Sequence, residues 1–101
     1  MEIRKTQNGD ICVLALSGRI DTLTSPRVQE SLTETISSSS CGKIELDFAE
    51  VSYLSSAALR ILLTGAQGAR AAGKTMTLKN VSAEVMKIFE VTGFSRILTI
   101  G

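Results

Sequence analysis

The sequence predicts a single α/β domain, in which a small mixed β-sheet of four or five strands has an N-terminal hairpin and helices packed against it. Three observations lead to this fold class. Short apolar runs alternate with segments of helical periodicity, in the order β-β-α-β-α-β-α-β. An Asn-Gly pair near the start is typical of a tight hairpin turn. The 101 residues suffice for one hydrophobic core, so we expect one domain over residues 1–101.

The N-terminal hairpin is expected over roughly residues 2–17. Asn8-Gly9-Asp10 supplies its turn. Residues 11–16 are nearly continuous in apolar side chains, as in a strand covered on both faces. Gly18 is expected to end or bend this strand.

The first helix is expected from about residue 26 to 37. Thr24 or Ser25 would cap it, and Pro26 would take the first helical position. Apolar residues then recur at intervals of four, which makes the helix amphipathic: Val28, Leu32 and Ile36. A serine-rich link over residues 37–42 follows.

The second half of the chain repeats the alternation of strand and helix. The predicted strands cover residues 43–48, 75–78 and 97–100. The helix that starts near Ser56 is expected to stop at Gly73, in the left-handed position after its last turn. The third helix is expected to start at Ser82 and to end at Thr92-Gly93.

The composition excludes several classes of function. The 11 basic and 10 acidic residues give a net charge of +1, which offers no reason to expect direct binding of nucleic acid or of an anionic membrane. The chain has no histidine, which removes Ser-His-Asp catalysis and most transition-metal sites. We therefore expect no enzyme activity, cofactor or metal. Without a bilayer-spanning run or a signal peptide, we expect a cytoplasmic protein that does not insert into membranes.

The two cysteines are expected to be free thiols. Cys12 lies in an apolar run and Cys41 in the serine-rich link. Disulfides are rare in chains without export features, and this spacing matches no zinc site.

The segment over residues 46–60 carries the functional prediction. It reads Leu-Asp-Phe-Ala-Glu-Val-Ser-Tyr-Leu-Ser-Ser-Ala-Ala-Leu-Arg, so an apolar strand gives way to a short link and then to Ser55 and Ser56, just before a helix. A serine there caps the helix by accepting a hydrogen bond from a free backbone N–H. The same position suits a phosphate, because free N–H groups and the positive end of the helix dipole point outward. The residues alone favour the plain cap.

This segment resembles the core motif of the STAS domain family, to which the anti-sigma factor antagonists belong. Two further segments resemble the family's pattern in the right order. These are Leu16-Ser17-Gly18-Arg19-Ile20-Asp21-Thr22 and Val85-Met86-Lys87-Ile88-Phe89-Glu90-Val91-Thr92-Gly93-Phe94. The resemblance covers nearly the whole chain and implies the same mixed sheet with helices packed against it.

The resemblance also implies site residues. It aligns Ser56 with the family's phosphorylated serine, while Ser55 replaces a frequent aspartate and is a rival phosphorylation site. Ala58 replaces a usual glycine, so the loop is expected to be more regularly helical. The implied partner-binding surface consists of Asp21, Thr22, Ser55, Ser56, Ala57 and Arg60.

The residues by themselves offer simpler roles for several of these positions. Asp21 suits a turn carboxylate equally well, and Arg60 suits a solvated helix surface. Asp47, Glu50 and Asp21 form no acid–base or metal site that the sequence supports, because nothing supplies a nucleophile with its base.

The resemblance implies a binding module that captures an anti-sigma factor and so frees a sigma factor. The anti-sigma factor would be a serine kinase that inactivates the chain at Ser56, and a serine phosphatase would restore it. The alternative is a STAS accessory subunit of a membrane lipid-transport ATPase, in which the same loop docks the ATPase. We expect a monomer, with a weak dimer as the other option.

Overall fold

The computed structural model describes residues 1–101 and confirms the predicted fold class. Five strands form one mixed sheet, joined with three α-helices and a short 3-10 helix. The elements are β1 (Glu2–Asn8), β2 (Ile11–Ile20), α1 (Ser25–Ser37), β3 (Lys43–Leu54), α2 (Ser56–Ala71), β4 (Thr75–Lys79), α3 (Ala83–Thr92), η1 (Phe94–Arg96) and β5 (Thr99–Ile100).

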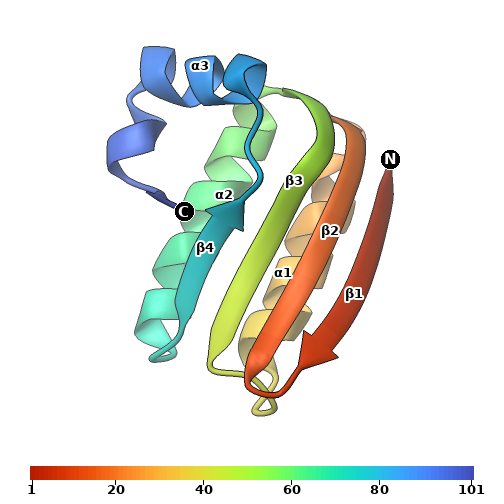
Figure 1. Ribbon diagram of the computed structural model, residues 1–101, viewed down its shortest axis with the longest axis vertical. Coiled ribbons are helices and arrows are strands. Elements are labelled where there is room, and N and C mark those ends of the chain that lie inside the picture. Colours follow the sequence, from red (N-terminus) through yellow and green to blue (C-terminus); the bar gives the residue numbers. More distant parts are fainter.

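The strands lie in the order β1-β2-β3-β4-β5. β1 and β2 form the predicted antiparallel hairpin, with Gly9 at φ +61° in its turn, and the other neighbours are parallel. Figure 1 shows α1 and α2 together on one face of the sheet, while α3 lies at the end toward which β3 and β4 run. None of the helices combines the length and the apolar character needed to cross a bilayer.

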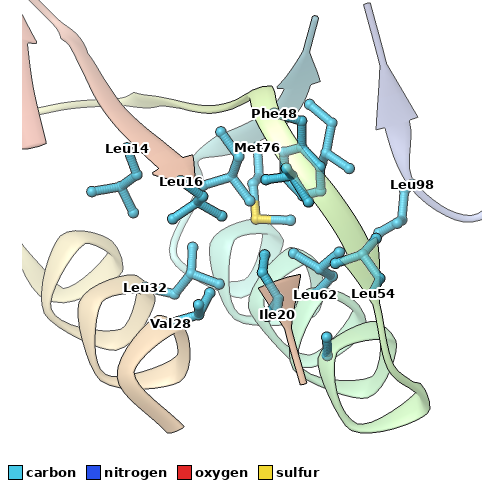
Figure 2. Packing of buried hydrophobic residues seen from close by; sticks show 14 of the residues in the cluster. Leu14, Leu16, Ile20, Val28, Leu32, Phe48, Leu54, Leu62, Met76 and Leu98 are labelled. Carbon is cyan, nitrogen blue, oxygen red and sulfur yellow. The ribbon is translucent and has the colours of Figure 1, made fainter. Parts of the chain in front are cut away.

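The hydrophobic core fills the space between the sheet and the pair α1 and α2, as Figure 2 shows. Alternate side chains of the central strands point into it, including Leu14, Leu46 and Leu78, none of which is accessible to solvent. Phe48 extends the core toward α3, because its ring lies 6.2 Å from that of Phe89 between centroids. This packing fixes α3 at the end of the sheet.

β2 is covered on one face only, contrary to the expectation from its continuous apolar run. Its buried residues alternate with half-buried ones, and the second set faces away from the helices: Ile11, Val13 and Ala15. Gly18 bends the strand at φ +89° but does not end it, since β2 continues to Ile20.

β3 is longer than predicted, because it continues beyond Phe48 to Leu54. Its register with β2 shifts twice: Ala15 pairs with Asp47 but Ser17 with Glu50, and Gly18 pairs with Val51 but Arg19 with Tyr53. At each shift β3 contains one residue more than β2, as in a β-bulge. The buried side chains therefore recur every third residue at this end of the strand, which hides the alternation of a regular strand.

The last strand is shorter than predicted. Residues 97 and 98 lie outside β5, which begins at Thr99. Gly93 adopts the left-handed conformation that ends α3, and the chain then turns through η1. The N–H of Ile97 donates to the carbonyl of Phe94 at 3.0 Å, so this residue belongs to the turn.

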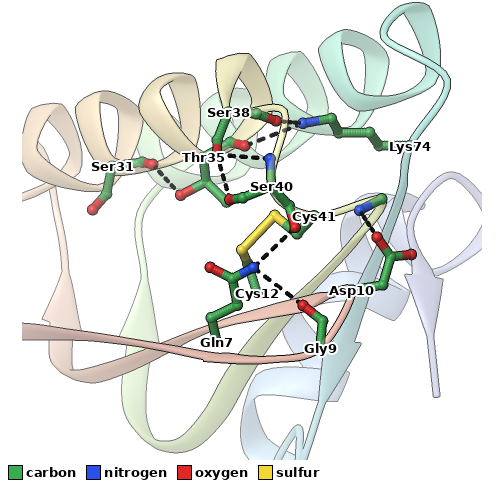
Figure 3. Close-up of a disulfide and its surroundings, with 11 residues drawn as sticks. Gln7, Gly9, Asp10, Cys12, Ser31, Thr35, Ser38, Ser40, Cys41 and Lys74 are labelled. Atoms are coloured by element: carbon green, nitrogen blue, oxygen red, sulfur yellow. Dashed lines mark hydrogen bonds between the residues drawn. A yellow bond between two sulfur atoms is a disulfide. The ribbon is translucent and has the colours of Figure 1, made fainter.

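The prediction of free thiols is wrong, because Cys12 and Cys41 form a disulfide with Cα atoms 5.9 Å apart. The parallel register explains the approach, since Ile11 at the start of β2 pairs with Lys43 at the start of β3. Figure 3 shows Asp10 beside the bond, where its carboxylate accepts from the N–H of Gly42 at 2.8 Å. The prediction relied on the cellular compartment, whereas the pairing follows from the fold.

Candidate functional site

The predicted site residues lie on two loops that follow neighbouring strands. Ile20 ends β2 and pairs with Leu54, which ends β3. The N–H of Ser55 donates to the carbonyl of Ile20 at 2.9 Å and so joins the two strand ends. Because each loop starts from this pair, the turn that begins at Asp21 and the start of α2 form one surface. We call the set Asp21, Thr22, Leu23, Ser55, Ser56, Ala57 and Arg60 the Ser56 surface.

The two adjacent serines have different structural roles. Ser55 is the N-cap of α2, and its hydroxyl accepts a hydrogen bond from the N–H of Ala58 at 3.2 Å. Ser56 is the first residue of the helix and is exposed. Ala58 is buried inside a regular first turn, as expected for alanine in place of glycine. The cap that the sequence left open between two serines is therefore Ser55.

Asp21 organises the turn before α1. Its carboxylate accepts hydrogen bonds from the N–H groups of Leu23 and Thr24, both at 3.0 Å. Hydrogen bonding lowers the pKa of Asp21 below its ordinary value of 3.8, and the largest contribution comes from the N–H of Thr24. Asp21 is therefore a turn carboxylate, as the sequence suggested, and its turn lies beside the start of α2.

The predicted side-chain cap of α1 is absent. The hydroxyl of Thr24 donates to the carbonyl of Arg19 at 3.0 Å and accepts from the N–H of Asp21 at 2.9 Å. It makes no cap hydrogen bond to the helix. Ser25 is buried as the first helical residue, with its hydroxyl directed to the carbonyl of Thr22 at 3.5 Å. The turn uses the hydroxyls that were expected to cap the helix.

The sequence prediction missed the most exposed apolar residue of the surface. Leu23 is 87% exposed, between Thr22 and Thr24 in the Asp21 turn. An apolar residue in a turn otherwise built of polar side chains was the available signal. Thr22 and Arg60 are also exposed, whereas Ala57 is half-buried.

The other two acidic residues considered above lie away from the Ser56 surface. Asp47 belongs to β3, where its carboxylate accepts from the N–H of Ala49 at 3.0 Å and from the side-chain amide of Asn80 at 3.1 Å. Glu50 is exposed further along the same strand, opposite Ser17. Both have structural surroundings that involve no part of the Asp21 turn.

Two features of the Ser56 surface determine what it can do chemically. It offers one exposed hydroxyl at a helix N-terminus, where an added anion is stabilised by the helix dipole. It also offers an exposed leucine, Leu23, and covering its apolar surface with a partner would favour binding. Both features are suited to recognition by another protein.

Comparison with known proteins gives matches over nearly the full chain. The family model described as Mlab, STAS domain, matches residues 3–99. An anti-sigma-B factor antagonist from Listeria monocytogenes is 32% identical over 97 residues, which are 96% of this chain and 82% of that protein.

Solved structures show the same fold at lower identity. An anti-sigma factor antagonist from Mycobacterium paratuberculosis superposes with a TM-score of 0.87 at 17% identity, over 98% of this chain and 83% of that one. The phosphorylated form of SpoIIAA, a Bacillus cell fate determinant, superposes with a TM-score of 0.75 at 17% identity, over 99% and 91% of the two chains.

Proposed function

Because the chain belongs to the STAS domain family, we propose that it is an anti-sigma factor antagonist, which captures an anti-sigma factor and thereby frees a sigma factor. The observation that carries the proposal is the position of Ser56. It is the first residue of α2, its side chain is exposed, and it lies on the surface that α2 shares with the Asp21 turn. The name of the Listeria relative supports the same function.

Phosphorylation of Ser56 is the proposed off-switch. A phosphate there adds a charge of about −1.5 to −2 at a helix N-terminus, which the domain tolerates because the dipole favours an anion. The hydroxyl of Ser55 already serves the helix cap and is half-buried, which makes it the poorer acceptor. The added charge and bulk would block the partner without refolding the domain.

Leu23 is the proposed apolar anchor of the interface. Binding energy in protein interfaces concentrates in a few well-buried side chains, and Leu23 has most of its surface available for burial. Thr22, Ala57 and Arg60 would form the polar and small-residue rim around it, with Asp21 holding the turn in shape.

The proposed partners follow from this function. The anti-sigma factor would be the serine kinase that modifies Ser56, and a serine phosphatase would reverse the modification. The chain itself is a binding module without catalysis of its own, acts in the cytoplasm as one domain over residues 1–101, and is a monomer or a weak dimer.

An affinity capture experiment tests this function. Wild type, Ser56→Ala, Ser56→Asp and Ser55→Asp are used as baits in lysate of the source cell, and retained proteins are identified by mass spectrometry. We expect wild type and Ser56→Ala to retain an anti-sigma factor with a kinase domain, and Ser56→Asp to lose it. Equal retention of that protein by wild type and Ser56→Asp would contradict the switch.

The transporter-accessory role is the second candidate. The family model that matches residues 3–99 is described as Mlab, STAS domain, and this description does not mention sigma-factor regulation. In this case wild type and Ser56→Asp would both retain subunits of a lipid-transport ATPase, and no anti-sigma factor. Ser56 would then be only the first residue of the helix.

A further inference from the structure

β1 forms one border of the sheet and has no strand on its outer side. It is the first strand in the order and pairs only with β2, as Figure 1 shows. The register with β2 is unbroken over all seven residues, from Glu2 opposite Ser17 to Asn8 opposite Ile11. The strand contains no proline and no bulge, either of which would interrupt an edge. β1 is therefore a continuous template for a further strand.

The turn of the hairpin shows which main-chain groups of β1 point outward. Gly9, its first residue, is at φ +61°, and Asp10 has no positive φ, as in a type II′ turn. In such a turn Asn8 and Ile11 are joined by main-chain hydrogen bonds. In an antiparallel pair the bonded residues alternate with residues whose N–H and carbonyl groups face the other way. Three residues of β1 therefore direct both groups to the outer edge: Ile3, Lys5 and Gln7.

These outward groups have no partner within the chain. The main-chain hydrogen bonds outside the helices and strand pairs involve no residue from 2 to 8. The side chains of Gln7 and Arg27 donate hydrogen bonds nearby, but only to carbonyls that lie outside β1. An unpaired strand edge of this length can pair with a strand of another molecule.

The opposite border of the sheet offers no comparable edge. The N–H of Thr75 donates to the carbonyl of Gly42 at 3.2 Å, and the N–H of Gly101 donates to the carbonyl of Leu78 at 3.0 Å. The outermost strand on that side, β5, is only two residues long. Two copies that join through the same edge form a closed two-fold dimer, and without a second long edge the pairing cannot continue into a fibre.

The side chains along β1 favour a second copy over an acidic or a basic peptide. A groove of about 270 Å³ lies between β1 and α1. Its charged side chains are balanced, two basic and two acidic: Lys5, Arg27, Glu30 and Glu34. A peptide of one charge sign would meet two like charges here. A copy turned by a two-fold axis brings the same balanced set in reverse order.

We propose that the chain forms a two-fold dimer in which β1 pairs antiparallel with β1 of a second copy, centred on Ile3. The outward N–H and carbonyl of Ile3 then exchange main-chain hydrogen bonds with Ile3 of the second copy. The two isoleucine side chains, each half-buried against its own core, lie next to each other. Glu2 lies opposite Arg4 of the second copy, which gives two ion pairs by symmetry, because both side chains are exposed on the same face of the strand.

Other registers of the two strands lack this complementarity. A dimer centred on Arg4 or on Lys5 would place two like charges directly opposite each other, which is unfavourable. A dimer centred on Thr6 or Gln7 brings no opposite charges of β1 together. In the Ile3-centred register Lys5 lies opposite Met1 and meets no second cation. The charge pattern of β1 therefore selects the register as well as the partner.

The dimer is tested with the purified full chain. We expect sedimentation velocity over a concentration series to show a monomer–dimer equilibrium. In ¹⁵N NMR the amide signals of Ile3 and Lys5 should shift with concentration more than those of Arg4 and Thr6, whose N–H groups are bonded to β2. A monomer at every concentration that NMR requires, or shifts confined to other parts of the domain, would overturn the proposal.

The register has its own readout in a mixture of isotope-labelled and unlabelled chains. Facing residues of a non-hydrogen-bonded pair have their Hα atoms close together. We therefore expect a nuclear Overhauser effect between Hα of Glu2 in one copy and Hα of Arg4 in the other. Contacts between the two Arg4 residues, or between the two Thr6 residues, would overturn the Ile3-centred dimer.

Charge exchange gives the second arm of the test. Glu2→Arg and Arg4→Glu each place like charges opposite each other, so each alone should weaken dimerisation about fivefold or more. Both changes in one chain restore the opposite charges and should return the affinity to within about twofold of wild type. Lys87→Glu, an exposed change in α3, is the control for net charge and should also stay within about twofold. A double variant as weak as the single variants, or equal weakening by Lys87→Glu, would overturn the proposal.

The proposed dimer does not rest on the capture of an anti-sigma factor. Its measurements use the chain alone, whereas the lysate experiment with Ser56→Asp reports on the proposed function. No residue of the Ser56 surface belongs to β1. Either proposal can therefore fail while the other holds.

Discussion

The hydroxyl of Ser55 accepts a hydrogen bond from the N–H of Ala58 at 3.2 Å, which makes Ser55 the cap of α2 and leaves Ser56 exposed beside it. Ser55→Ala removes this bond from an otherwise unpaired N–H. We expect a loss of about 1 kcal/mol in the free energy of unfolding. Urea denaturation followed by circular dichroism measures it.

Ser56→Ala is the matched control, because it changes the neighbouring hydroxyl without removing a cap. We expect a change within about 0.5 kcal/mol, as for other exposed positions. Ser56→Asp should be at least as stable as wild type, since a carboxylate at the helix N-terminus is favoured. A larger loss for Ser56→Ala than for Ser55→Ala would show that the two serines have been assigned the wrong way round.

The helix at Ser56 was predictable because its signals are local. A serine before a helix-forming run, and Gly73 and Gly93 after the helices, act on their nearest neighbours, and the structure contains all three as expected. The end of β3 was not predictable in this way. Its last residues are kept in the sheet by pairing with β2, and two register shifts remove the alternation from the sequence.

The remaining differences also involve contacts between distant segments. One side of β2 stays uncovered because both flanking helices pack on the other face, a choice of topology that residues 11–16 do not encode by themselves. Leu23 is exposed because the hydrogen bonds of Asp21 fix its turn. Local sequence patterns therefore indicated where the candidate site lies, whereas the side chains that its surface exposes could be identified only from the fold.

The carboxylate of Asp21 should make stability depend on pH. Its pKa is lowered below 3.8 in the folded state, chiefly by the N–H of Thr24. A lowered folded-state pKa means that the ionised form stabilises the fold; this contribution is complete above the unfolded pKa and disappears as the pH falls through the folded pKa. NMR titration of the Asp21 side chain should give a midpoint below 3.8.

Asp21→Asn tests the consequence for folding. The variant keeps an oxygen acceptor but has no charge, so it should be less stable than wild type near neutral pH. The difference should shrink as the pH falls below 3.8. Gln29→Ala, an exposed change in α1 that removes no ionisable group, is the control and should leave the pH profile unchanged. A constant difference between Asp21→Asn and wild type at all pH values would contradict an ionic contribution.

Gly65 should be required for the close packing of α1 on α2. A Cβ atom added there would lie 3.0 Å from Cδ1 of the buried Leu32, which is tighter than an ordinary van der Waals contact, so this side chain would have to shift from its packed position. We expect Gly65→Ala to lower the free energy of unfolding by about 1 kcal/mol, despite the better helix propensity of alanine. Thermal and urea unfolding measure the change.

Gly68 is the matched control on the same helix. Its added Cβ would lie 3.6 Å from Cδ1 of Ile36, an ordinary contact. Gly68→Ala should therefore raise the free energy of unfolding by up to about 1 kcal/mol, through helix propensity and reduced freedom of the unfolded chain. If both alanine variants were stabilised equally, the packing contact of Gly65 would not be limiting.

The disulfide between Cys12 and Cys41 should stabilise the domain by closing a loop that contains the Asp21 turn and α1. The two residues are 29 apart in sequence, and a loop of this size corresponds to roughly 3–4 kcal/mol in the chain-entropy account. Both cysteines are buried, at 0% and 2% exposure, so a reductant should reach the bond only when this part of the protein opens.

Reduction and the variant Cys12→Ala with Cys41→Ala should therefore have the same effect. Each should lower the free energy of unfolding by roughly 3 kcal/mol, because both remove the same loop constraint from the unfolded chain. Reductant should change nothing further in the double variant, which controls for effects of the reductant itself. Thiol titration of oxidised protein should find none under native conditions and the two cysteines of the sequence only after reduction in denaturant. Two reactive thiols in untreated protein, together with a double variant as stable as wild type, would show that the bond does not hold β2 to the link between α1 and β3 in solution.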